Sequence, residues 1–329
     1  MKKDIIKQNM LPISMIAGAV MYLTYHYMPE PIHQAGPVLE HILAIVQPLL
    51  IFTMLFLTFC RIEPRELRPH KWHWWLLLIQ GGSFTLLGLA IALLSRLHPA
   101  GLFECKVLIE SAMLCLICPT ATAAAVVTRK LGGDIPGVTT YTILINILTA
   151  ILIPAIVPLI QPMGDMNFWD AFCRILAKVF PLLIMPCLAA WLVRYLFPAA
   201  HKLILSKPDL AFNIWAVSLS LAIAVTVKAI VHSTMPVYLM LLIALVSLLC
   251  CALQFALGHK VGGRFGEDDM KVTAGQALGQ KNTVFAIWVG YTFMTPETSI
   301  VGGIYSIWHN LYNSWQLRRS SISSSILSP

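Results

Sequence analysis

The sequence predicts an all-α integral membrane protein of ten transmembrane helices, and three observations support this. Hydrophobic residues make up 58% of the 329 residues and charged residues only 12%, which is about half the charged share of a soluble domain. Apolar runs long enough to cross a bilayer recur from one end to the other. Basic residues alternate regularly between these runs. A soluble core of this length could not bury so large an apolar excess.

Ten runs, bounded by charges, Pro or Gly, reach the roughly 20 residues that a helix needs to cross the hydrocarbon core. They are 11–28, 38–60, 73–96, 107–128, 135–160, 177–197, 210–231, 235–257, 272–292 and 297–317. The first resembles a signal peptide, but a second span follows at once, so we expect an uncleaved helix. We expect the charged stretch 168–178 to be an interfacial lead-in to the sixth span. The serine-rich tail 318–329 is expected to be a short disordered cytoplasmic segment.

The basic residues predict the orientation of the spans. If the N-terminus is cytoplasmic, most of the 23 Lys and Arg residues fall in cytoplasmic loops or at the cytoplasmic ends, as short loops of membrane proteins require. The loops at 61–72 and 258–271 carry several of them. We therefore predict a multi-pass protein of the cell membrane, of the bacterial inner-membrane type, with both termini in the cytoplasm.

Two of the ten spans contain residues that interrupt a helix near mid-membrane. The fourth contains Pro119, which lacks a backbone N–H and obstructs the preceding turn. The ninth contains the polar stretch 279–283 (Gly-Gln-Lys-Asn-Thr). The two spans lie five apart and run in opposite directions, which is the pattern of inverted repeats that cross at a binding site. We predict a first repeat over 1–160, a second over 161–317, and broken, crossing fourth and ninth helices.

Lys281 is the most unusual residue of the ninth span. It lies about ten residues from either end, or about 15 Å deep, where a charged side chain costs at least ~3 kcal/mol. Its stem is too short to reach the membrane surface from there. It could instead form a purely structural buried pair with Glu110, although Glu110 is nearer the outer surface and would also suit the outer mouth of a pathway.

At these two spans the sequence resembles the bile acid:sodium symporter family. The family's C-P-G-G-T-A-S-N-like segment appears at 118–125 as Cys-Pro-Thr-Ala-Thr-Ala-Ala-Ala, and its E-x-G-x-Q-N-[ST] segment at 277–283 as Ala-Leu-Gly-Gln-Lys-Asn-Thr. The resemblance implies a core of spans 3–5 and 8–10 with a panel of spans 1, 2, 6 and 7. It also implies that Gln80 corresponds to a further sodium ligand on the third span.

This chain departs from the family at the sodium ligands. Ala124 and Ala125 replace a Ser-Asn pair, Ala277 replaces a glutamate, and Lys281 replaces a glutamine. A hard cation needs several oxygen ligands, so the two sodium ions of the family could not bind in the same way. The amine of Lys281 is expected to supply the positive charge instead.

The expected function is a secondary transporter that moves a small organic anion, bile-acid-like or another carboxylate or sulfonate, by alternating access without those sodium ions. The predicted substrate and coupling site consists of Lys281, Asn282, Gln280, Thr283, Thr120, Thr122, Pro119, Gln80 and Glu110. One alternative is a proton-coupled or exchange transporter of the same fold in which Lys281 titrates, because burial disfavours the charged amine. A membrane enzyme is less favoured, since no His/Asp/Glu cluster lies at membrane depth.

The remaining patterns exclude other classes of partner. The net charge of +8 does not indicate nucleic-acid binding, because the basic residues form short clusters between apolar spans. Cys115 and Cys118 form a C-x-x-C without the second pair that zinc would need. We expect no catalytic residue, metal, cofactor or obligate protein partner, and membrane lipid as the surroundings.

Overall fold

Residues 10–29, 36–97, 101–207 and 209–327 are described by a computed structural model, with side chains up to Arg319. This part of the chain is built of helices and contains no strand. The first half holds α2 (Met10–His26), α4 (Gly36–Phe59), α5 (Lys71–Leu97), α6 (Phe103–Ile117), α7 (Ala124–Lys130) and α8 (Ile135–Ile160). The second half holds α9 (Phe168–Leu183), α10 (Met185–Leu196), α11 (Pro198–Leu205), α12 (Leu210–His232), α13 (Val237–Gly262), α14 (Asp268–Gly279), α15 (Thr283–Phe293) and α16 (Ser299–Leu327). Short 3-10 turns occupy Pro64–Glu66 and Pro296–Thr298.

The chain is a multi-pass membrane protein. Six helices of the described part are long and apolar enough to cross a membrane, namely α4, α5, α8, α9 continued by α10, α12 and α13. The apolar α2 and α15 are shorter. Lys2, Lys3 and Lys7, which support a cytoplasmic N-terminus, lie outside the described residues.

Local sequence signals account for several helix ends. Asp134 caps α8, where its carboxylate accepts from the N–H of Gly137 at 3.1 Å, and Pro136 occupies the first turn, where no N–H is needed. Asn167 caps α9 in the same way, through the N–H of Asp170 at 2.9 Å. Both caps lie at the start of apolar runs, where such residues predict a helix start.

The stretch 168–178, expected to be an interfacial lead-in to the sixth span, is the helical first part of α9. By length and apolarity, α9 with α10 forms one candidate span over Phe168–Leu196. Ala171, Ile175 and Val179 recur every fourth residue and are buried, so the apolar side of the helix packs against α8 and α4. The charged residues of the stretch are exposed.

The tail also differs from the expectation. Helix α16 continues to Leu327, whereas 318–329 was expected to be disordered. The segment 318–327 contains neither Pro nor Gly, so no residue in it breaks the helix that precedes it. Residues 328–329 lie outside the described part.

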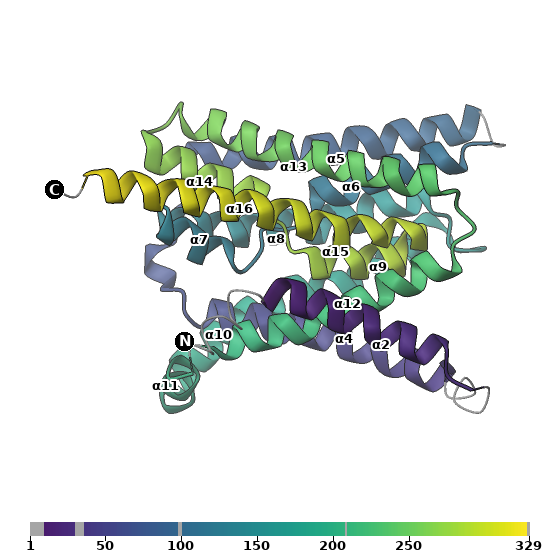
Figure 1. The fold of residues 1–329 in the computed structure, drawn as a ribbon, viewed down its shortest axis with the longest axis horizontal. Helices are drawn as coiled ribbons and strands as arrows, with labels where there is room; N and C mark the ends of the chain where they lie inside the picture. Colours follow the sequence, from purple (N-terminus) through teal and green to yellow (C-terminus); the bar gives the residue numbers. More distant parts are fainter. Residues whose placement is uncertain (1–9, 30–35, 98–100, 208, 328–329) are drawn as a thin grey trace.

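The helices form two groups (Figure 1). In the first, α4 packs against α10 and α12, and α12 also packs against α2; in the second, α5, α6, α8, α13, α14 and α16 pack on one another. The first group lies below the second in Figure 1, and α9 links them by packing against α8 and α4. This division agrees with the panel and core that the resemblance implies. In the same view α16 ends at the left end of the molecule.

Candidate functional site

The fourth and ninth predicted spans are each interrupted. Helix α6 ends at Ile117 and α7 begins at Ala124, while α14 ends at Gly279 and α15 begins at Thr283. Pro119 explains the first break, because a residue before proline is driven out of the helical region; Cys118 is extended, with φ −55° and ψ 135°. At the second, the side-chain oxygen of Asn282 caps α15 by accepting from Phe285 N at 3.2 Å.

The two breaks, residues 118–123 and 280–282, lie against each other, and we name them together the crossover. Thr120 and Lys281 form an antiparallel bridge. Ala121 N donates to Gln280 O at 2.9 Å, and Asn282 N donates to the Pro119 carbonyl at 2.8 Å. The chain therefore brings seven of the predicted site residues into or beside one pairing of two interrupted helices, namely Pro119, Thr120, Thr122, Gln280, Lys281, Asn282 and Thr283.

The carbonyls freed at the end of α6 accept from side chains of neighbouring helices. Gln80 Nε2 donates to the carbonyls of Ile117 (3.1 Å) and Cys118 (2.9 Å), and Thr149 Oγ1 donates to Ile117 O at 3.0 Å. The Gln80 oxygen accepts from Tyr141 OH at 2.8 Å. The Gln80 amide nitrogen thus binds the end of α6, while its oxygen is held by Tyr141. These bonds satisfy backbone carbonyls that lipid could not.

Two residues that sequence reasoning missed complete this support. Tyr305 OH donates to Gly279 O, at the end of α14, at 2.8 Å. Gln254 Nε2 donates both to Cys115 O and to Tyr305 OH, each at 3.1 Å. Gln254 is a single amide in the apolar run 235–257, and such isolation was a signal that it bridges helices.

Thr120 and Thr122 provide a matched test of the crossover. Thr120 Oγ1 is buried and donates to Ala277 O at 2.7 Å, whereas Thr122 is only partly buried. We expect Thr120→Val to destabilise the protein by about 1–3 kcal/mol, because it leaves a buried carbonyl without its donor. Thr122→Val should change stability much less. Thermal unfolding of both variants in detergent measures the difference, and equal stability of the two would contradict this role for Thr120.

Lys281 lies at the negative end of α6. Its side chain is buried, with 2% of the residue exposed, and its Nζ donates to Leu116 O at 3.3 Å. No carboxylate of the described residues lies within ion-pair distance of it. The partial negative charge of a helix C-terminus favours a cation. The Lys281 amine is therefore stabilised by a carbonyl at the end of α6 and not by a carboxylate.

Glu110 does not join Lys281. Its carboxylate is fully buried and accepts from Gln161 Nε2 at 2.7 Å and from Thr295 N at 3.0 Å. Lys106 lies 3.8 Å away, one turn earlier on α6. In this structure Glu110 therefore does not pair with Lys281, and its carboxylate is not exposed. Glu110 instead joins α6 to the ends of α8 and α15.

The polar residues of the crossover line a small cavity of about 30 Å³. Its walls include Thr122, Gln280, Lys281, Asn282 and Thr283, together with His309, Asn310, Met54 and Trp215. Three buried lining atoms, Gln280 Oε1, Asn282 Nδ2 and His309 Nδ1, have no hydrogen-bond partner among the described residues. The volume suits about one water molecule and is too small for an organic anion.

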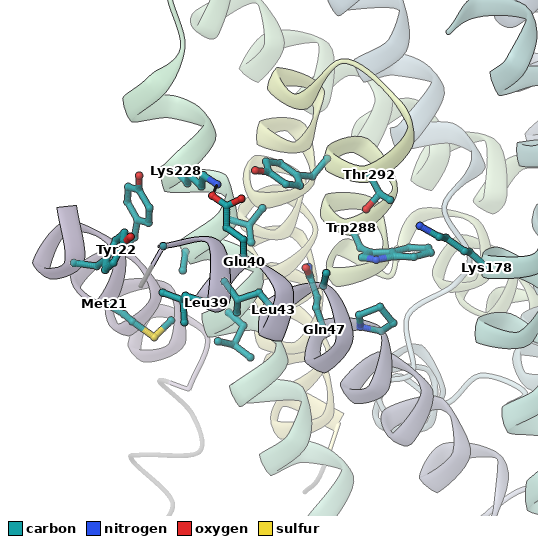
Figure 2. A pocket seen from close by; sticks show the side chains of 18 residues that line it. Met21, Tyr22, Leu39, Glu40, Leu43, Gln47, Lys178, Lys228, Trp288 and Thr292 are labelled. Carbon is teal, nitrogen blue, oxygen red and sulfur yellow. Dashed lines mark hydrogen bonds and ion pairs between the residues drawn. The ribbon is translucent and has the colours of Figure 1, made fainter. Parts of the chain in front are cut away.

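A much larger cavity, of about 690 Å³, lies between α2, α4 and α12 on one side and α15 on the other. Figure 2 shows its lining, in which Met21, Leu39, Leu43 and Trp288 form apolar wall. Trp288 lies five residues after Thr283 on α15, or about 7.5 Å along the helix. One short helix therefore connects this cavity with the crossover.

The large cavity carries two lysines from two helices. Lys228 on α12 pairs with Glu40 on α4 at 2.5 Å, and Lys178 on α9 lies over the ring of Phe293, 5.8 Å from its centroid. The sequence analysis singled out neither lysine as a candidate binding residue. The signal that it overlooked is that each lies inside a predicted span, 177–197 or 210–231, and not in a loop.

Comparison with protein families gives a match over nearly the whole chain. The chain matches the model of the SBF-like CPA transporter family, a family related to the bile acid:sodium symporters, over residues 14–322. No curated protein matches the chain significantly.

Proposed function

We propose that this chain, which belongs to the SBF-like CPA transporter family and is a membrane transporter, moves a small organic anion across the cell membrane by alternating access. The observation that carries this proposal is the 690 Å³ cavity beside α15, the second half of the interrupted ninth span. In this account ten spans form two inverted repeats, 1–160 and 161–317, and the cavity opens toward the outside.

The chemistry of the large cavity suits an amphipathic anion. Its volume lies in the range of small-molecule sites, about 300–1,000 Å³. Most of its wall is apolar, with the indole of Trp288 and the phenol rings of Tyr22 and Tyr291. The ammonium groups of Lys178 and Lys228, against the single carboxylate of Glu40, give the lining a net positive charge. A ligand with an apolar body and an anionic group matches both features.

We further propose that transport does not use sodium, and that Lys281 provides the positive charge at the crossover. Ala124, Ala125 and Ala277 offer no side-chain oxygen, and a hard cation needs oxygen ligands. The Lys281 amine already lies against Leu116 O, at the end of α6. An ammonium at about 4 Å would repel a cation by about 4 kcal/mol at an effective dielectric of 20. The crossover therefore does not fit sodium.

The second candidate is a proton-coupled or exchange transporter of the same fold in which Lys281 titrates. The buried amine without a carboxylate partner favours it, because burial disfavours the charged form. In this case an imposed pH gradient would change the uptake rate of the wild type and would no longer do so after Lys281→Gln. An enzyme is less favoured, since no group of three His, Cys, Asp or Glu residues in the described chain could hold a catalytic metal.

The transport proposal is tested with purified protein in liposomes and the fluorescent anion naphthalene-2-sulfonate. We expect protein-dependent uptake, accelerated when unlabelled anion is preloaded inside, because an alternating-access site exchanges ligand across the membrane. Empty liposomes measure leakage. Binding without any protein-dependent flux would contradict the proposal.

The predicted orientation is tested with a native cysteine. Cys105 is exposed at the start of α6, on the outer side in this account. Cys173 on α9 is also exposed and lies on the same side in this account. We expect a membrane-impermeant maleimide to label intact cells and the double variant Cys105→Ala with Cys173→Ala to lose that signal. A cysteine introduced in this variant at Arg61 or Arg264, in the loops expected to be cytoplasmic, should stay unlabelled until the membrane is opened. Labelling of either in intact cells would contradict the orientation.

A further inference from the structure

We infer that the large cavity selects anions carrying one negative charge, with Lys178 as the anchor for that charge and Glu40 as the group that rejects a second. The inference deepens the proposed function and rests on it. It depends on how the charged groups of the cavity pair with one another.

The charge of Lys228 is already compensated. Its Nζ lies 2.5 Å from Glu40 Oε1, and the pair joins α12 to α4 across the cavity wall. The same ammonium lies over the ring of Tyr291, 5.7 Å from the centroid. An arriving anion would have to compete with a carboxylate already bound to this lysine. Lys228 with Glu40 therefore offers an anion little net attraction.

Lys178 is the uncompensated charge. No carboxylate of the described residues lies within ion-pair distance of it, and its described partner is the face of the Phe293 ring. Figure 2 shows Lys178 and Gln47 on opposite sides of Trp288, with the Lys228–Glu40 pair well away from Lys178. A positive charge without a counter-ion at one end of an apolar cavity is an anchor for a single anionic group.

Gln47 provides a second donor in the wall of the same cavity. Gln47 lines the cavity and is only 6% exposed. Its side-chain Nε2 has no hydrogen-bond partner among the described residues. A buried donor without a partner costs free energy unless a ligand satisfies it. An anion in the cavity presents acceptor oxygens, which this N–H lacks in the protein itself.

Together these groups determine the net charge of the lining. Two ammonium groups against one carboxylate leave one uncompensated positive charge among the lining residues. A monoanion neutralises it, whereas a dianion brings a second negative charge toward Glu40. Across about 8 Å, at an effective dielectric of 20–30, one unit charge changes an anion's affinity by about tenfold.

The test compares two anions of identical skeleton, naphthalene-2-sulfonate and naphthalene-2,6-disulfonate, by calorimetric binding to the purified full chain. We expect the wild type to prefer the monoanion. Glu40→Gln frees the charge of Lys228, so the ratio of dianion to monoanion affinity should rise about tenfold. The double variant Glu40→Gln with Lys228→Gln removes that charge again and should restore the wild-type ratio. Lys178→Gln should weaken monoanion binding about tenfold.

Asp268→Asn is the matched control, because it makes the same charge change in the exposed pair with Lys271 at the start of α14, away from the cavity lining. An affinity ratio that is the same in wild type and Glu40→Gln, or unaltered monoanion binding in Lys178→Gln, would overturn the inference. The proposed function fails separately. If binding follows the charge pattern but liposomes show no uptake of the monoanion, transport is contradicted and the charge selection stands. If liposomes show uptake with the same charge preference in every variant, the charge selection is contradicted and the proposed transport stands.

Discussion

Lys281→Gln should reduce protein-dependent uptake of naphthalene-2-sulfonate at least tenfold in sodium and in choline buffer alike. The change removes the buried amine that lies against the end of α6. It restores the residue type of the related sodium symporters but not their carboxylate, since Ala277 remains. The crossover then has neither the fixed ammonium nor the ligands that a sodium ion needs. Initial uptake rates in proteoliposomes measure the loss.

Lys281→Met separates a role in transport from a role in folding. If the amine is only structural, the apolar methionine side chain, which is similar in length, should leave uptake unchanged and even raise stability. Buried charges are often replaceable by apolar residues. We expect Lys281→Met to remain folded by size-exclusion chromatography and thermal unfolding, yet to be inactive. Uptake near the wild-type rate in this variant would contradict the role proposed for Lys281.

Gly279→Ala should destabilise the protein by about 2 kcal/mol or more and abolish transport. A Cβ at this position, the last residue of α14, would meet the ring atoms of Phe255 at 2.5–2.6 Å. The ring is buried against Tyr312, with centroids 4.2 Å apart, so it cannot move without disturbing its neighbours. Overpacking of this kind costs about 1–3 kcal/mol, and here it would also displace the carbonyl that accepts from Tyr305.

A matched glycine and a compensating change make this prediction specific. Gly82 lies within α5, and a Cβ added there would meet no atom within 4 Å, so Gly82→Ala should raise stability slightly, by about 0.5–1 kcal/mol. Phe255→Leu should recover part of the stability lost in Gly279→Ala, because it removes the ring that the new methyl meets. Thermal unfolding of the wild type, the two alanine variants and the double variant checks both. No difference between the two alanine variants would contradict the packing argument.

The two helix interruptions could be predicted from sequence because their causes are local. Pro119 removes a donor, and the stretch 279–283 places a lysine and two amides in an apolar run. The pairing of opposite breaks followed from their spacing along the chain. What the sequence could not specify was the direction of the Lys281 side chain, since the choice between a ligand, Glu110 and the carbonyl of Leu116 depends on how the helices pack.

The large cavity was missed for the same reason. Lys178, Lys228 and Glu40 are far apart in the chain, and each alone fits a charge near the end of a span. Only packing shows that Glu40 neutralises Lys228 and leaves Lys178 without a carboxylate partner among the described residues. The early start of α9 likewise depended on the i, i+4 recurrence of Ala171, Ile175 and Val179 against α8 and α4. A span defined by overall apolarity starts later, because the exposed charges of the same helix lower the average hydropathy.

The most direct test of the account is the initial rate of naphthalene-2-sulfonate uptake by the wild-type protein in liposomes, measured in sodium and in choline buffers of equal ionic strength. The account predicts equal rates, because the crossover carries a fixed ammonium and alanines where a sodium ion would need oxygen ligands. Strong stimulation by sodium would contradict it, since ligands elsewhere in the chain would then have to bind the ion.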